Sequence, residues 1–287
     1  MAKPVFNITG STLDADISAK ALLLMEVNET SFSYVIVDEK QKMLLAAYFV
    51  LTQSDGRNLA EAIRDIVDSQ EVLQNEFREA VVVYNFSETT LVPGSFYHHE
   101  ANRDLMDLLF GNFKKGLVLS EKGNNPDLHT LYRIPAAVHS LLQQKFSAGR
   151  YWHIYTLWLS SLEKTIADEE PENIYLVFAA DKVLTAVFKD RRLQIIQSFS
   201  YTTPEDVVYH LLHCCAQLSL SQDNCLLHIS GFIDEDSALY SEIKKYFLRL
   251  QFDTIEPINP DEGSEELTPS EFPPHYFSYL QKLALCV

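Results

Sequence analysis

Glycine, proline and cysteine are scarce in this chain. Its 287 residues include 9 glycines, 11 prolines and 4 cysteines. So few glycines and prolines exclude a collagen-like or low-complexity chain, and long flexible linkers are not expected. The cysteines are too few for a disulfide framework in a chain of this length, and they are typical of buried thiols in a reducing compartment. We therefore expect a cytoplasmic protein.

Lysine and arginine are also few in this chain. The 23 Lys and Arg residues face 40 Asp and Glu residues, which gives a net charge of -17. Such a surface repels phosphate backbones, so nucleic-acid binding is not expected. No apolar run approaches the ~18 residues of a membrane span, and the first 17 residues lack the apolar core of a signal peptide. What the chain does have is 47% hydrophobic residues, enough for a sizeable core.

Two stretches are typical of three short strands joined by tight turns. Apolar residues fill or alternate along each strand, and polar residues separate the strands. The strands expected in the first stretch are 21–27, 32–38 and 43–51, and those in the second are 174–179, 182–189 and 193–200. The pattern therefore predicts two β-meanders.

A capped helix and a buried strand follow each meander. Asn58 and Glu61 have capping-box spacing, and Thr203 precedes a proline at the first helical position. The next strand begins near Ala80 in one case and near Cys225 in the other. We interpret the chain as one β-β-β-α-β-α unit used twice, by internal duplication. The predicted divisions are an N-terminal arm (1–20), a first subdomain (21–166), a linker (167–172) and a second subdomain (173–287). Residues 128–166 could belong to the first half or bridge both.

This order of elements resembles the actin-like ATPase superfamily. It is most similar to a family of uncharacterised bacterial proteins assigned there, and more remotely to the pilus-assembly actin-like proteins. The resemblance covers roughly residues 20–257 and implies an α/β fold of two tandem RNase H-like subdomains. In active members, nucleotide lies between the halves, glycine-rich turns hold its phosphates, and a first-strand carboxylate orients metal-bound water.

The first phosphate position departs from the family pattern. The Asp-x-Gly of active members falls on Glu26-Val27-Asn28, which supplies a longer carboxylate and replaces glycine by asparagine. The turn also contains Thr30 and Ser31, which offer hydroxyl and amide donors.

The two positions in the second half also depart from it. The second hairpin falls on residues 179–182, where no glycine occurs and Asp181 and Lys182 lie toward the turn. The adenosine position has the single glycine Gly231 where two are usual.

These departures lead to two hypotheses. The first is a protein-interaction or scaffold module without catalysis, with degenerate phosphate loops, no cofactor, and another protein as its partner. The alternative is a divergent ATP-binding switch or ATP hydrolase that uses ATP and Mg. In that case Glu26 is the candidate catalytic residue, and the residues that would contact the nucleotide are Asn28, Thr30, Ser31, Asp181, Lys182 and Gly231.

One group of residues could bind a metal ion. It comprises His210, His213, Cys214, Cys215, Cys225 and His228. His210 and Cys214 are four residues apart on one predicted helix, a workable ligand spacing. There is no Cys-x-x-Cys pair, and Cys215 falls on the buried stripe of that helix. We interpret the group as packed thiols and ordinary histidines, and we predict no metal site.

Overall fold

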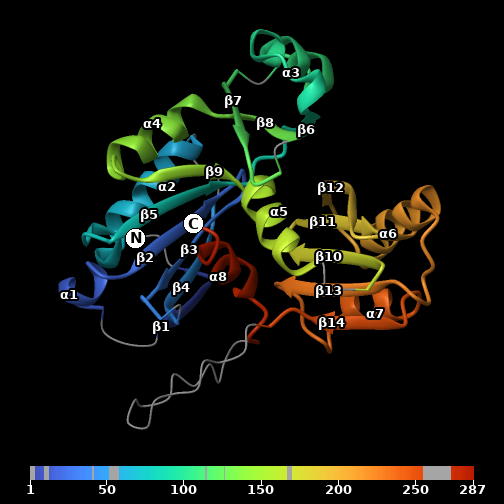
Figure 1. Ribbon diagram of the computed structural model, residues 1–287. Coiled ribbons are helices and arrows are strands. Elements are labelled where there is room, and N and C mark those ends of the chain that lie inside the picture. Colours follow the sequence, from blue (N-terminus) through green and yellow to red (C-terminus); the bar gives the residue numbers. More distant parts are fainter. Residues whose placement is uncertain are drawn as a thin grey trace. The chain divides into compact units, whose positions relative to one another are not determined.

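The computed structural model describes residues 4–9, 13–40, 42–51, 58–113, 115–125, 127–166, 170–254 and 273–287 (Figure 1). The chain divides into two units, one of residues 1–161 with 283–287 and the other of residues 162–282. Residues 167–169 of the predicted linker lie outside the described part. Among the described residues, none of the helices combines the length and apolar character that a bilayer crossing needs.

The first unit is built on a six-stranded sheet with the order β1-β4-β3-β2-β5-β9. The strands β2, β3 and β4 form the predicted antiparallel meander, and β5 and β9 then add in parallel. The strand bounds are β1 (Phe6–Thr9), β2 (Leu22–Val27), β3 (Ser31–Val37), β4 (Met43–Val50), β5 (Glu79–Tyr84) and β9 (Arg150–His153). Strand β2 is buried along its whole length because it has neighbours on both edges and apolar residues on both faces.

Helices α2 (Leu59–Ser69) and α4 (Ala136–Lys145) pack on this sheet. The capping box at the start of α2 is present, since Asn58 Oδ1 accepts from Glu61 N–H at 3.0 Å and Glu61 Oε2 accepts from Asn58 N–H at 3.0 Å. The buried stripes of both helices join the strands in one apolar core. Shorter elements of this unit are α1 (Ala15–Ser18), η1 (Glu71–Gln74), η2 (Gly94–Phe96) and η3 (His99–Ala101).

A three-stranded antiparallel sheet is inserted after β5, with the order β6-β8-β7. Its elements are β6 (Thr89–Pro93), α3 (Asn102–Phe110), β7 (Leu117–Lys122) and β8 (Leu128–Ile134). Met106 of α3 is buried against Val92 and Leu131 in a small core of its own. Helix α5 (Ile154–Thr165) then carries the chain across the boundary between the units.

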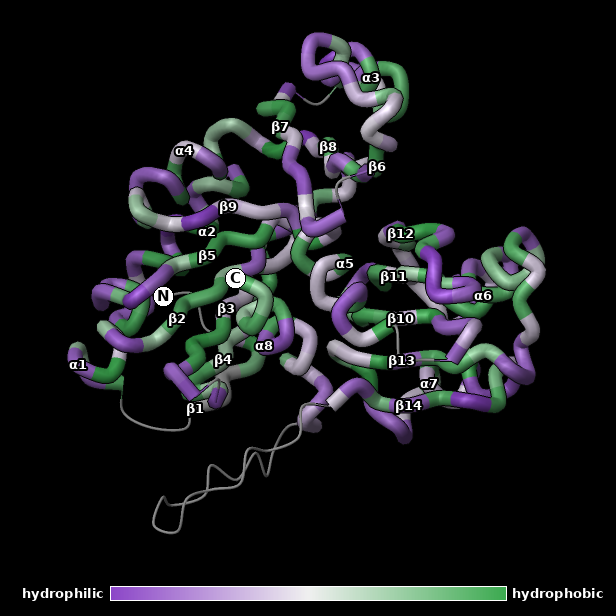
Figure 2. Tube along the Cα trace, viewed as in Figure 1, coloured by the Kyte–Doolittle hydropathy of each residue, from purple (hydrophilic) through white to green (hydrophobic). Residues whose placement is uncertain are grey.

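The second unit contains a five-stranded sheet with the order β12-β11-β10-β13-β14. Its strands are β10 (Glu172–Phe178), β11 (Lys182–Lys189), β12 (Arg192–Ser200), β13 (Leu226–Gly231) and β14 (Arg249–Phe252). Helices α6 (Pro204–Leu218) and α7 (Ala238–Lys244) share its apolar core. Helix α8 (Ser278–Ala284) ends the chain. Figure 2 shows the central strands β2, β5, β10 and β11 largely in green, as expected for buried strands.

The two larger sheets share one topology, with an antiparallel meander whose first strand has a parallel neighbour. The predicted fold class, two tandem α/β units each with a mixed sheet, is therefore confirmed. Internal duplication stays a prediction. The inserted sheet was not predicted as a unit, and the predicted N-terminal arm contains β1, which pairs with β4.

Candidate functional site

The turn between β2 and β3 is closed by the side chain of Asn28. Its Oδ1 accepts from the backbone N–H of Thr30 at 2.8 Å and from that of Ser31 at 2.7 Å. Its Nδ2 donates to Ser31 Oγ at 2.7 Å. Asparagine favours such turns because its short amide can bond to the backbone two or three residues on. The N–H groups that a phosphate loop would offer to a ligand are therefore bonded within the turn.

Glu26 lies on β2 and has only 4% of its surface exposed. Its Oε1 accepts a hydrogen bond from Asn85 Nδ2 at 2.6 Å. Asn85 directly follows β5, the parallel neighbour of β2, so adjacent strand ends bring the two side chains together. A buried carboxylate needs such donors to replace the water that it loses. The first-strand carboxylate thus has a partner within its own unit.

The hairpin between β10 and β11 is a tight turn without glycine. Ala179 N–H donates to the carbonyl of Lys182 at 2.9 Å, which closes the turn around residues 180 and 181. The Tyr201 hydroxyl donates to the Ala179 carbonyl at 2.7 Å, and Tyr201 N–H donates to the Asp181 carbonyl at 3.1 Å. Asp181 is exposed and Lys182 is buried. The hairpin is therefore fixed by groups of its own unit.

Gly231 ends β13 with a φ of +84°, and β13 runs parallel to β10. A Cβ at this position would lie 2.2 Å from the carbonyl oxygen of Phe178, the last residue of β10. Only glycine allows that approach and that backbone conformation. Because Phe178 and Gly231 are paired, the Asp181 turn and Gly231 belong to the same end of the second sheet.

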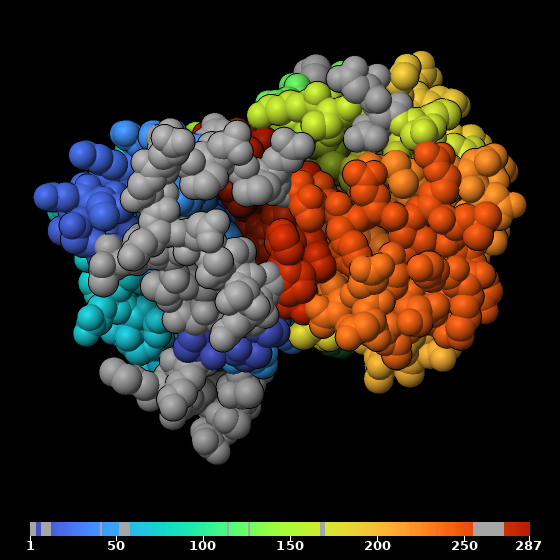
Figure 3. Space-filling model, turned by 90° about the horizontal axis from the view of Figure 1, so that it is seen from below, coloured from blue at the N-terminus to red at the C-terminus, as the bar shows by residue number. Residues whose placement is uncertain are grey.

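Within the second unit, the C-terminal segment (residues 273–282) covers the residues that follow Gly231. Gly231 N–H donates to the His275 carbonyl at 2.9 Å, and His275 Nε2 donates to the Ile233 carbonyl at 2.6 Å. The Tyr276 hydroxyl donates to Asp234 Oδ1 at 2.7 Å. Burial lowers the pKa of His275, which favours the neutral ring. Figure 3 shows the red atoms of the C-terminal segment directly against the orange atoms of this unit.

The residues considered as metal ligands do not form a cluster. Cys214, Cys215 and Cys225 are buried in the apolar core of the second unit. His228 lies instead beside Tyr175, with ring centroids 4.3 Å apart, and its Nε2 is 3.1 Å from Asn173 Oδ1. Burial lowers the pKa of His228 to about 4. Within the described ranges, no three His, Cys, Asp or Glu side chains are grouped so that they could hold a metal ion.

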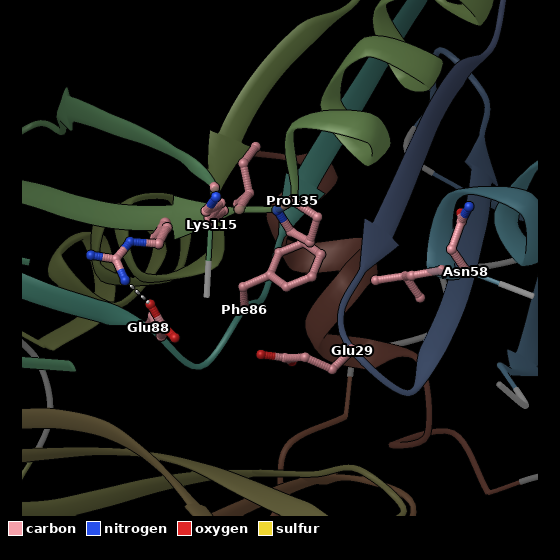
Figure 4. A pocket seen from close by; sticks show the side chains of 10 residues that line it. Glu29, Asn58, Phe86, Glu88, Lys115 and Pro135 are labelled. Carbon is pink, nitrogen blue, oxygen red and sulfur yellow. Dashed lines mark hydrogen bonds and ion pairs between the residues drawn. The ribbon is translucent and has the colours of Figure 1, made fainter. Parts of the chain in front are cut away.

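The first unit contains a cavity of about 420 Å³ beside the joint of the inserted sheet with the main sheet (Figure 4). Most of its lining is apolar. The lining residues are Glu29, Asn58, Leu59, Phe86, Glu88, Lys115, Gly116, Arg133, Ile134 and Pro135. In Figure 4, the Phe86 ring lies next to Pro135, and the Glu29 side chain runs below Phe86.

The charges around this cavity are held in place by neighbours. Arg133 is buried and donates to Glu88 Oε2 at 2.9 Å, to Asp107 Oδ1 at 2.5 Å and to the Gly111 carbonyl at 2.8 Å. Glu29 Oε1 accepts from both N–H and Oγ–H of Ser87, each at 2.7 Å. The cavity therefore has a fixed polar margin around an apolar floor, which is the usual composition of a binding pocket.

The comparisons with known proteins agree with this fold. A protein-family model described as "Protein of unknown function (DUF3822)" matches residues 10–250. The chain belongs to this family. The comparison with curated proteins finds no match.

Two solved structures show what the family's fold is similar to. A Bacteroides thetaiotaomicron protein with actin-like ATPase fold and unknown function has 16% identity and a TM-score of 0.72, over 85% of this chain and 94% of that chain. The PilM-PilN type IV pilus biogenesis complex gives 13% identity and a TM-score of 0.59, over 93% of this chain and 98% of that chain. This DUF3822 member therefore has the actin-like ATPase fold, as the resemblance implied.

The sequence did not reveal the cavity, because its lining comes from five separate segments. One residue that lines the cavity does stand out in the sequence. Arg133 is a single cation in the otherwise apolar end of a strand, Leu131-Tyr-Arg-Ile134, and such a residue needs buried partners. Its partners, Glu88 and Asp107, are 45 and 26 residues away in the sequence, so no local motif identifies them.

A second polar cluster of this DUF3822 chain lies where β7 meets the start of α5. Glu121 Oε1 accepts from His153 N–H at 2.7 Å, and Glu121 Oε2 accepts from the Tyr132 hydroxyl at 3.0 Å. Burial raises the pKa of Glu121 to about 7 from an ordinary value of 4.5, although these hydrogen bonds oppose the rise. The folded protein therefore binds this proton more tightly than the unfolded chain does.

Glu121→Gln is expected to stabilise the protein at pH 8 and to change little at pH 5. A raised carboxyl pKa costs stability as the pH rises from about 4.5 to about 7, because the unfolded chain releases the proton first. Between pH 5 and pH 8 the variant should gain about 2–3 kcal/mol over the original chain. Urea denaturation at both pH values measures it, with Glu100→Gln on the exposed surface of η3 as control. An equal effect of Glu121→Gln at both pH values would contradict the assignment.

Proposed function

We propose that this protein is a non-catalytic protein-interaction module in which the actin-like fold is kept and the phosphate loops are degenerate. The Asn28 turn carries the proposal. A triphosphate would have to displace the Asn28 side chain from the N–H groups of Thr30 and Ser31, and Asn28 would then lose its own partners. Breaking buried hydrogen bonds costs about 1–3 kcal/mol for each group left unpaired.

The other nucleotide positions support the same proposal. Glu26 is engaged by Asn85, whereas a carboxylate that orients metal-bound water must face that water. The peptide after Gly231 is covered by His275 and Tyr276. The residues present therefore do not fit ATP and Mg, and we derive no reaction through them.

The partner that we propose is another protein. One structure with the same fold is a complex, the PilM-PilN type IV pilus biogenesis complex. The cavity beside the inserted sheet offers an apolar floor of the kind that protein interfaces use. The net charge of -17 disfavours nucleic acid as a partner. We propose a cytoplasmic location, which the free thiols of the core cysteines support.

ATP with Mg²⁺ is expected to leave the melting temperature unchanged to within about 1 °C. A ligand present at a hundred times its Kd adds about 2.7 kcal/mol of stability, which would raise the melting temperature by about 5 °C or more. The measurement is a thermal-shift titration up to about 5 mM ATP, with Mg²⁺ alone as the reference. This titration shows whether the protein binds nucleotide, and it requires no knowledge of the partner protein.

Glu26→Gln serves as the discriminating variant, since its amide oxygen can still accept from Asn85. A rise in melting temperature with ATP that this variant abolishes would refute the proposal. It would instead identify the chain as a divergent nucleotide switch that uses Glu26.

A further inference from the structure

We propose that the cavity of the first unit binds an extended segment of a partner protein through one large apolar side chain with a lysine or arginine next to it. This inference rests on the proposed function and names its binding site and the chemistry of its partner. It is carried by the shape of the cavity, by its fixed walls and by its charge.

The size of the cavity suits a large apolar side chain. An apolar cavity of about 150 Å³ holds a benzene ring. The cavity here measures about 420 Å³. It therefore accommodates a side chain of the size of Phe, Leu or Met together with part of the backbone on either side. Phe86, Leu59 and Pro135 supply the apolar surface that such a side chain would contact.

The walls are formed before any partner binds. Phe86 is 4% exposed and its ring packs 6.2 Å from that of Tyr84. At Gly116 a Cβ would lie 2.6 Å from the Ile134 carbonyl oxygen, so the chain passes there in close contact with the end of β8. A pre-formed pocket loses little entropy of ordering when its ligand binds.

The charge of the cavity favours a basic neighbour beside the apolar side chain. Arg133 already forms ion pairs with Glu88 and Asp107, so it is not available to a partner's carboxylate. The lining itself is balanced, with Glu29 and Glu88 facing Arg133 and Lys115, and Asp107, which bonds Arg133 from outside the lining, adds one further negative charge. Glu29 lines the cavity (Figure 4), and hydrogen bonds from Ser87 hold its carboxylate. A lysine or arginine beside the inserted side chain would meet this carboxylate.

The net charge of the whole chain also favours a basic partner segment. The chain carries a net charge of -17, which attracts basic segments and repels acidic ones, a second copy of this chain included. Rim charges of this kind mainly raise the rate of association, whereas the buried apolar side chain determines how long the complex lasts.

The test is a selection of random twelve-residue peptides displayed on phage, with the full chain as the target. We expect the enriched peptides to share a large apolar residue next to Lys or Arg. Synthetic versions of these peptides are then titrated by fluorescence anisotropy. Glu29→Lys is expected to weaken binding at least about tenfold, and Glu29→Gln about threefold, because the glutamine keeps an oxygen for Ser87.

Glu39→Lys is the matched control. It makes the same charge change on an exposed turn at the opposite end of β3, and binding should change less than about twofold. The proposal is overturned if no peptides are enriched, if the enriched peptides are acidic, or if Glu29→Lys binds them as well as the original chain does. These outcomes leave the ATP titration untouched, so the failure of one proposal is distinguishable from the failure of the other.

Discussion

Gly231→Ala is expected to lower the free energy of unfolding by about 4 kcal/mol. The positive φ of +84° alone costs a residue with a Cβ about 1–3 kcal/mol. In addition, the new Cβ would lie 2.2 Å from the Phe178 carbonyl oxygen and 2.7 Å from its nitrogen. Relieving that overlap must separate the ends of β10 and β13, which adds about 1–3 kcal/mol. Urea denaturation followed by circular dichroism measures the loss.

Gly94→Ala is the control for this substitution. The nearest atom to a Cβ at Gly94 lies 3.5 Å away, which is an ordinary contact, and the backbone there is not left-handed. Alanine at Gly94 is therefore expected to be neutral, or to stabilise by less than about 1 kcal/mol through the unfolded chain. A Gly231→Ala variant that loses as little stability as Gly94→Ala would show that the end of β13 can open. The C-terminal segment would then not be held in place by its hydrogen bond from Gly231 N–H to the His275 carbonyl.

The meanders could be predicted because their information is local. In β11, Val183 and Val187 enter the core, while Asp181 precedes the strand and Asp190 follows it, so period and turns both mark the strand. The inserted sheet could not be predicted in this way. Its central strand β8 pairs with β6, where Thr89 is opposite Tyr132, so the pairing depends on residues far apart in the sequence. Strand β9 has only four residues before α5 begins, too few to establish a period.

The candidate site shows the same limit. The sequence revealed that Asn28 stands where active relatives have glycine, but not that its amide takes over the bonds of the turn. That conclusion needs the turn's geometry. The role of the C-terminal segment was also missed, because His275 and Ile233 are 42 residues apart.

Arg133→Met is expected to lower the free energy of unfolding by about 3–5 kcal/mol. The Arg133 side chain is 4% exposed and joins Glu88, which directly precedes β6, to Asp107 of α3. Methionine fills the space but leaves the Glu88 carboxylate, with 12% of its side chain exposed, without its cation. Uncompensated buried charge is the main cost, because its lost hydration is not replaced. Urea denaturation at pH 7 measures the effect.

The double variant Arg133→Met/Glu88→Gln separates charge from packing. If the cost of Arg133→Met comes from the Glu88 carboxylate that has lost its cation, removing that charge should return the free energy of unfolding to within about 2 kcal/mol of the original chain. If the cost came from lost packing of the arginine stem, the second substitution would recover nothing. Asp107 offers a comparison, because its side chain is 39% exposed and water can replace the guanidinium there. Arg133→Met/Asp107→Asn should therefore recover much less than the Glu88 double variant, since the benefit of neutralising a carboxylate grows with its burial.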